Sequence, residues 1–241
     1  MIKFFRHIRQ NLIMENNTSK YFKYAIGEIV LVVIGILIAL QINTWNEQRK
    51  LDRDLVNVLK EVRSNLITDS LNIHDTRENK SEDIRIQNKV IHELESGNIP
   101  YDSLEYHLGR VMLTRRIVLV DNGYELMKKF GLERLQNAAL RDALINYYTV
   151  AVERIYEDTR DDDFEFIEVF LPYVRSHFID WNWNERGVPA DYEHFKNDQY
   201  FLTCLKVSIK NHESTLEQLQ IGSSQIRGIL PMLDQAIATY D

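Results

Sequence analysis

The sequence predicts an all-α protein: an N-terminal transmembrane helix that continues into a long helix and is followed by an antiparallel helical-bundle domain. Three observations lead to this fold class. Residues 29–46 carry no charged side chain. The chain has only nine glycines and four prolines, so helices should be long and loops few. From Leu51 onward, apolar residues recur mostly at steps of three and four, as on one face of a helix.

Residues 1–20 are predicted to form a basic amphipathic segment. Apolar side chains such as Phe5 and Ile8 fall near one helical face, and basic ones such as Arg6 and Arg9 lie around the other. A segment of this kind suits the surface of an anionic membrane leaflet. A retention sequence without specific lipid contact explains the same charges.

Residues 21–46 are predicted to be the transmembrane helix. Tyr24 and Trp45 are separated by roughly 31 Å along a helix, close to the hydrocarbon thickness of a bilayer. Aromatic residues at both ends match the preference of amphipathic rings for the lipid–water interface. No small-x-small cleavage pattern follows the apolar run, so an uncleaved anchor fits better than a removed signal peptide.

One face of this helix is a candidate packing surface. Glu28, Val32, Gly35 and Ala39 share that face, and Gly35 with Ala39 forms a small-xxx-small pair that lets two helices approach closely. A homo-oligomer or a membrane protein partner is expected to pack there. The carboxylate of Glu28 also lies close enough to the helix end to reach the lipid headgroups instead.

The charge distribution bears on partners and location. The net charge is −7; residues 1–46 carry five basic and two acidic side chains, which leaves −10 for the remainder. An acidic body without a basic stripe argues against nucleic acid as a partner. The basic residues on the two sides of the span are equal in number. A short N-terminal arm and a long acidic domain favour a single-pass inner-membrane protein with a cytoplasmic N-terminus and a periplasmic C-terminal domain.

Residues 47–241 are predicted to form one acidic helical domain. The polar run Asp75–Glu82 is expected to break its first helix, and Ile117–Val120 is the one stretch where a short strand competes with helix. Pro172 is expected to end or kink a long central helix. Residues 222–224 are expected to interrupt the last helical segment.

The central helix carries two further signals. Asn137 is placed to cap its N-terminus. An acidic run at residues 157–165 lies in its middle, but the run lacks the glycine and the terminal glutamate of a calcium loop. The run is therefore expected to form a solvated face.

Seven aromatic residues lie between Phe164 and Trp183. Core packing at the end of the bundle explains most of them. Trp181 and Trp183, which stand in a Gly- and Pro-containing loop, are the candidate contacts for a partner or ligand, since exposed tryptophans often carry binding energy.

Motifs for catalysis are absent from the sequence. None of the seven histidines has a glutamate three residues before it, as di-iron helical bundles require, and Asp191 with His194 comes nearest. There is no zinc-protease motif, phosphate-binding loop or nucleophile elbow. The single cysteine, Cys204, excludes an internal disulfide and a multi-cysteine metal site. No catalytic residue, metal site or cofactor is expected.

Two blocks of the chain resemble a known family. The block IKFFR with YAIGEIVLVVIGILIALQINTWNEQRK is similar to the start of an uncharacterised single-pass membrane protein family of Gram-negative bacteria, a domain of unknown function. The stretch NGYELMKKFGLERLQNAALRDALINYY resembles that family's second block, although Lys129 and Phe130 replace the small polar residues expected before Gly131. The resemblance implies membrane attachment and helices, and it supplies no catalytic residue.

Two functions follow as hypotheses. The first is a membrane-anchored, non-enzymatic interaction or scaffold module of the cell envelope, whose partners are the lipid bilayer and another protein. The alternative is a small-ligand-binding sensor domain that signals through a partner protein. Only about 23 residues precede the span, too few for an output domain of their own.

Overall fold

The computed structural model confirms the all-α fold and describes residues 18–97, 101–111 and 114–240. The chain divides into two compact units, one ending at Asp54 and one formed by Leu55–Asp241. The predicted basic segment falls largely on residues 1–17 and lies outside the described residues.

The first unit is the N-terminal part of helix α2 (Thr18–Ser96). From Ala25 onward this helix is long and apolar enough to cross a membrane, and its most apolar described stretch has no buried residue. Large apolar side chains point outward all around it, with Leu31 64% and Leu37 58% exposed. An apolar surface of this extent is unfavourable in water and calls for a cover of lipid or protein.

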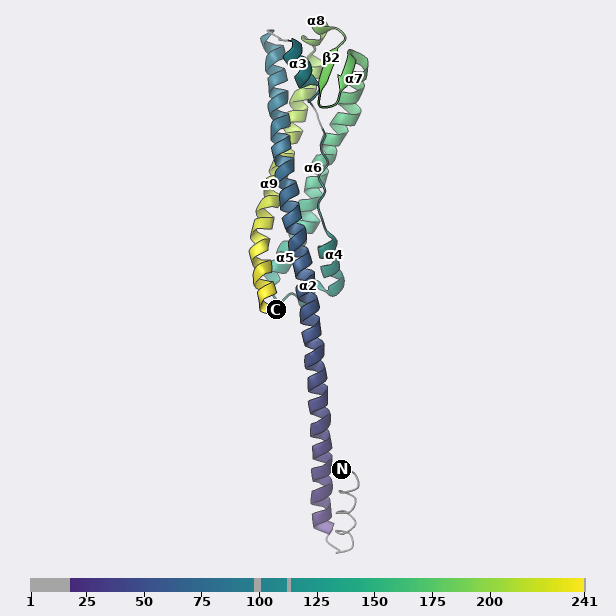
Figure 1. Ribbon diagram of the computed structural model, residues 1–241, viewed down its shortest axis with the longest axis vertical. Helices are drawn as coiled ribbons and strands as arrows, with labels where there is room; N and C mark the ends of the chain where they lie inside the picture. The colour runs from purple at the N-terminus through teal and green to yellow at the C-terminus, as the bar shows by residue number, and fades with distance from the viewer. Residues whose placement is uncertain (1–17, 98–100, 112–113, 241) are drawn as a thin grey trace. The chain divides into compact units, whose positions relative to one another are not determined.

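The second unit is a helical bundle built on three long segments: the rest of α2, the run α5 to α7, and α9 (Gln199–Tyr240) (Figure 1). The run α5 to α7 points in the same direction as α2, and α9 runs antiparallel to both (Figure 1). The remaining elements are α3 (Tyr101–Leu108), α4 (Asn122–Phe130), η1 (Leu132–Arg134), α5 (Ala138–Asn146), η2 (Tyr147–Ala151), α6 (Val152–Phe164), η3 (Glu165–Phe170), α7 (Leu171–His177), β1 (Phe178–Asn182), β2 (Arg186–Pro189) and α8 (Tyr192–Phe195).

Helix α2 continues without interruption through Asp75–Glu82, so the predicted break there is wrong. The hydroxyl groups of Thr76 and Ser81 donate to the carbonyl oxygens four residues earlier, which keeps these polar side chains compatible with helix. Lys80 lies fully buried against the other two long segments. Residues 75–82 have the composition of a loop, but tertiary contacts keep them helical.

The central helix begins as predicted, with the Asn137 side chain accepting a hydrogen bond from Leu140 N. It contains two π-helical segments, η2 and η3, and it passes through Pro172 to His177. Pro172 stands just after η3, at the first turn of α7. Because this turn follows a change in hydrogen-bond register, the missing proline N–H disrupts the helix less than it would in a regular α-helical interior.

Residues 114–121 form an extended connection back along the bundle, from the region of α3 to α4 (Figure 1). Ile117–Val120, where a short strand is expected to compete with helix, forms neither, and its backbone N–H groups bond side chains instead. Val120 N donates to Asp69 Oδ1 at 2.7 Å, and Leu119 N donates to the Tyr156 hydroxyl at 3.0 Å. The β-branched run is extended, but helices provide its hydrogen-bond partners.

Helix α9 is continuous, so the predicted interruption at residues 222–224 is also wrong. A Cβ at Gly222 would lie 2.9 Å from Ile155 Cδ1. This glycine therefore marks a close approach between α9 and α6, which share an extensive contact.

The bundle interior consists of two hydrophobic clusters separated along its length. The first cluster includes Leu59, Leu66, Tyr147, Ile155 and Ile226. The second cluster includes Val90, Leu104, Phe170, Phe201 and Leu205.

Candidate functional site

A layer of buried polar side chains separates the two hydrophobic clusters. It occurs at a similar level of all three long segments, between Ile73 of the first cluster and Val90 of the second on α2, and at corresponding places on α6 and α9. We call this set the polar layer. Its members are Lys80, Asp83, Gln87, Asp162, Ser208, His212 and Thr215, each buried.

Asp162 is the centre of this layer. Its carboxylate lies 2.6 Å from Lys80 Nζ, 2.8 Å from His212 Nδ1 and 2.9 Å from the Thr215 hydroxyl. Burial alone would raise the pKa of Asp162, but the hydrogen bond from His212 and the charge of Lys80 hold it below its ordinary value. The Asp162 carboxylate is therefore ionised at neutral pH, and together with its partners it links three helical segments, α2, α6 and α9.

The second carboxylate of the layer is less well satisfied. Burial raises the pKa of Asp83, against the opposing influence of Arg115, whose Nε lies 3.6 Å away. Both Asp83 oxygens and His212 Nε2 are buried without a hydrogen-bond partner among the described residues. Nδ1 of His212 lies between Asp162 Oδ1 at 2.8 Å and Lys80 Nζ at 3.2 Å.

The polar layer corrects the expectation of a solvated acidic face at residues 157–165. Asp162 is 4% exposed and belongs to the interior, whereas its neighbour Asp161 is exposed. His212 is a hydrogen-bonded core residue, 2% exposed. The layer joins the three segments through the contacts of Asp162 with Lys80 and His212.

The two predicted tryptophans come together on a β-hairpin where the sequence indicates an irregular loop. Strands β1 and β2 pair antiparallel, with Trp181 opposite Gly187 and an irregularity between Phe178 and Asp180. The rings of Trp181 and Trp183 are 5.7 Å apart and nearly perpendicular.

Trp181 takes the core-packing role. It is half-buried, its ring packs against those of Phe166 and Phe170, and its Nε1 donates to the carbonyl oxygen of Leu108 at 3.2 Å. Trp183 is 46% exposed, although one side of its ring contacts Phe166. Ile179 on the same hairpin is 74% exposed. The hairpin thus combines a buried anchor with two outward apolar side chains.

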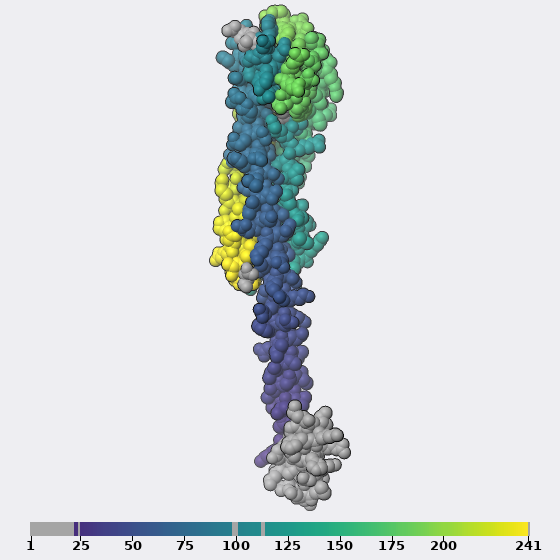
Figure 2. All heavy atoms as spheres, viewed as in Figure 1, coloured from purple at the N-terminus to yellow at the C-terminus, as the bar shows by residue number. Residues whose placement is uncertain are grey.

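The hairpin is held rigidly by the end of α3. Figure 2 shows the green atoms of the hairpin region against the teal atoms of α3. Asn184 N donates to the carbonyl oxygen of Gly109 at 2.8 Å. A Cβ at Gly109 would lie 2.3 Å from the backbone nitrogen of Arg186, so only glycine permits this approach. Asn184 itself adopts φ 62°, a conformation that asparagine tolerates in tight turns.

At Gly35, the centre of the predicted packing face of α2, no other described residue lies close to the helix. A Cβ at Gly35 would meet nothing within 4 Å. Val32 and Ala39 are exposed, and Glu28 is half-buried.

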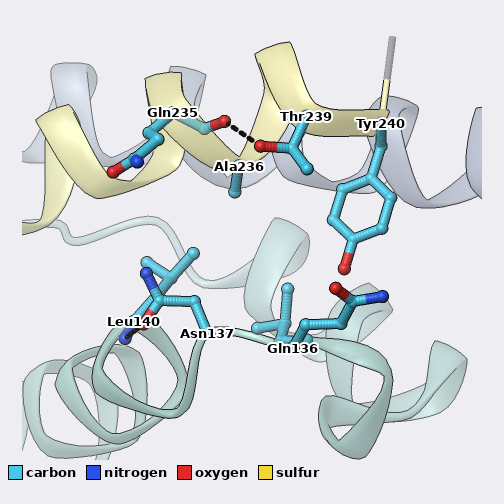
Figure 3. Close-up of a pocket in the computed structure, with 8 residues that line it drawn as sticks. Gln136, Asn137, Leu140, Gln235, Ala236, Thr239 and Tyr240 are labelled. Carbon is cyan, nitrogen blue, oxygen red and sulfur yellow. Dashed lines mark hydrogen bonds between the residues drawn. The ribbon is translucent and has the colours of Figure 1, made fainter.

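A small hollow lies between the start of α5 and the last turns of α9 (Figure 3). Its volume is about 270 Å³, and the polar side chains of Gln136, Asn137, Gln235 and Thr239 line it. The Thr239 hydroxyl is already used, because it donates to the carbonyl oxygen of Gln235 at 2.8 Å (Figure 3).

Another group of side chains could hold a metal ion. His177, His194 and Asp198 each place one ligand-type atom within 4.8 Å of the others. The three residues come from the end of α7, from α8 and from the turn before α9, at irregular spacing. Motif searches along the sequence miss such a group, because no regular element brings the residues together.

Comparison with known families gives one match. The sequence profile of DUF6090, a family of unknown function, matches residues 28–157, so the chain belongs to this family. The match includes the apolar part of α2 and ends in α6, before the hairpin. No curated protein and no solved structure matches the chain.

Proposed function

We propose that this DUF6090 chain is a membrane-anchored, non-enzymatic interaction module of the bacterial envelope, whose hairpin end contacts a protein partner. The observation that carries the proposal is the exposure of Trp183 and Ile179 on a hairpin whose backbone is fixed by α3. A preorganised apolar contact loses little conformational entropy on binding. Tryptophan is one of the side chains enriched at the energetic centre of interfaces.

In this proposal residues 21–46 cross the inner membrane, with the N-terminus in the cytoplasm and the acidic bundle in the periplasm. The outward apolar side chains of α2 and the charge difference between the two parts of the chain support it. Orientation is tested by Asn57→Cys in a Cys204→Ser background. Labelling of intact cells by a membrane-impermeant maleimide is the expected result, and labelling only after lysis contradicts it.

Partner contact is tested by cross-linking in intact membranes. A photoreactive amino acid at position 179 should give one defined adduct, and Trp183→Ala should abolish it. The matched control is Val118→Ala, which truncates a side chain that is 68% exposed away from the hairpin. An adduct that survives Trp183→Ala, or the absence of any adduct, contradicts the hairpin as the contact.

The membrane segment is proposed to assist assembly through Glu28, Val32, Gly35 and Ala39. Close helix approach requires the small side chains at its centre. Gly35→Leu should therefore weaken oligomers of the full chain in mild detergent, whereas Leu37→Ile should leave them intact. Equal oligomer populations for both variants would contradict the proposal that this face packs against another helix.

The small-ligand sensor is the second candidate, and the hollow of Figure 3 is the observation that favours it. Its volume of about 270 Å³ lies just below the usual range of about 300–1,000 Å³ for small-molecule sites, so only a very small ligand would fit. A stoichiometric small molecule in the purified full chain, detected by native mass spectrometry and lost in Thr239→Leu, would favour the sensor over the interaction module.

A further inference from the structure

Three side chains at the end of the bundle are arranged as metal ligands. We propose that His177, His194 and Asp198 bind a divalent transition metal ion of the zinc type. This site does not include Trp183 or Ile179, the apolar contact of the proposed function. A result that contradicts one proposal therefore leaves the other standing.

The donor set selects the class of metal. Two imidazole nitrogens and one carboxylate oxygen suit zinc and its neighbours, whereas magnesium and calcium prefer oxygen ligands alone. Ligand atoms around one tetrahedral zinc lie about 3.4 Å apart, because each bond to nitrogen or oxygen is about 2.1 Å long. The present separations of up to 4.8 Å close to that value when each side chain moves by about 1 Å. His194 is exposed and free of close core packing, so this movement is small for it.

His177 is held by the kind of partner that orients a metal-binding histidine. Its Nδ1 lies 3.0 Å from the carbonyl oxygen of Tyr173, to which it donates. Its ring also stacks on that of Tyr173, with centroids 4.2 Å apart. A histidine that donates from Nδ1 to a backbone carbonyl presents the lone pair of Nε2 to a metal.

Asp198 is oriented by several donors. Its Oδ2 accepts from the Tyr173 hydroxyl at 2.6 Å, and its Oδ1 accepts from the backbone N–H groups of Tyr200 and Phe201. Tyr173 therefore positions both the Asp198 carboxylate and His177.

The site has room for an exchangeable ligand. His177 and Asp198 line an open hollow of about 350 Å³ together with Tyr173 and Tyr200. Three protein ligands beside an open space are the arrangement in which zinc keeps a water molecule in its fourth position.

The test uses the full-length, tag-free chain in detergent, stripped with a chelator and titrated with zinc chloride against a chromogenic indicator. One zinc ion per chain is expected. His194→Ala should weaken binding by more than about 100-fold, because loss of a direct ligand costs at least as much as loss of a supporting partner. His92→Ala removes an exposed histidine elsewhere and should leave the affinity unchanged.

Two further variants separate ligation from structure. Asp198→Asn keeps the cap of α9, since asparagine caps as well as aspartate, but it removes the anionic ligand and should abolish tight binding. Tyr173→Phe should weaken zinc by about 10- to 100-fold with little change in the melting temperature of the metal-free chain. The proposal is overturned if zinc binds His194→Ala as tightly as the parent chain, if no zinc binds, or if magnesium competes equally.

Discussion

The buried ion pair of the polar layer gives the sharpest stability prediction. Lys80 and Asp162 have side chains 0% and 1% exposed, and their charged atoms are 2.6 Å apart. Lys80→Met leaves the Asp162 carboxylate buried with only the contacts to His212 and Thr215. Removing one partner of such a pair costs about 3–5 kcal/mol, because the remaining charge has lost both water and counter-ion.

The double variant reverses most of this loss. In Lys80→Met with Asp162→Leu no charge of the pair remains. The Thr215 hydroxyl still donates to the carbonyl oxygen of Asn211, so only His212 Nδ1 loses its acceptor. An unsatisfied buried donor costs about 1–3 kcal/mol. The double variant should therefore be more stable than either single variant.

The assay is urea unfolding of the full chain in detergent, followed by circular dichroism. Lys206→Met is the control, because Lys206 of α9 pairs with Glu95 of α2 at 3.1 Å but with side chains more than half exposed. That control should cost less than about 1 kcal/mol. The reasoning is refuted if Lys80→Met costs no more than Lys206→Met, or if the two single losses add in the double variant.

Three other predictions concern the supports of the bundle. Burial raises the pKa of Asp69 to about 6, above an unfolded value near 3.9. The protonated side chain therefore stabilises the fold fully below about pH 4, and the free energy of unfolding falls by about 3 kcal/mol as pH rises through 6. Asp69→Asn should remove this pH dependence from the free energy of unfolding measured between pH 4 and 7. Gly109→Ala should lower the free energy of unfolding by about 1–3 kcal/mol and change the tryptophan fluorescence, because the new Cβ meets the Arg186 backbone. An unchanged fluorescence spectrum would show that the contact between Gly109 and Arg186 does not position the hairpin. Asn137→Ala should cost about 1 kcal/mol through the lost cap and Asn137→Asp much less, and equal losses in the two would exclude capping as the cause.

Local signals in the sequence predicted the features that depend on local physics. The apolar, charge-free stretch of α2 and the cap at Asn137 each depend on a few neighbouring residues. For these features, the sequence contains the whole cause.

Long-range contacts decided the features that the sequence did not predict. Residues 75–82 carry a loop-like composition, but burial of Lys80 against Asp162 keeps them helical. Gly222 suggests an interruption, but it lets α9 approach Ile155. In both cases the residue type has two structural meanings, and the choice depends on a partner far away in the chain.

The candidate sites divide in the same way. An exposed Trp183 could be proposed from the sequence, since aromatic residues in a loop are a recognisable signal. The hairpin that holds it depends on Gly109, 74 positions earlier, and has no local signature. His177, His194 and Asp198 also lack a regular spacing, and only the fold brings them together.

Membrane attachment is the claim on which the proposed function rests most directly, and alkaline extraction of isolated membranes tests it. The full chain should stay in the membrane pellet at alkaline pH and enter solution only with detergent. A matched variant with Val33→Glu and Leu37→Lys, two outward positions of the apolar stretch, should be released. Release of the unaltered chain without detergent would contradict the account.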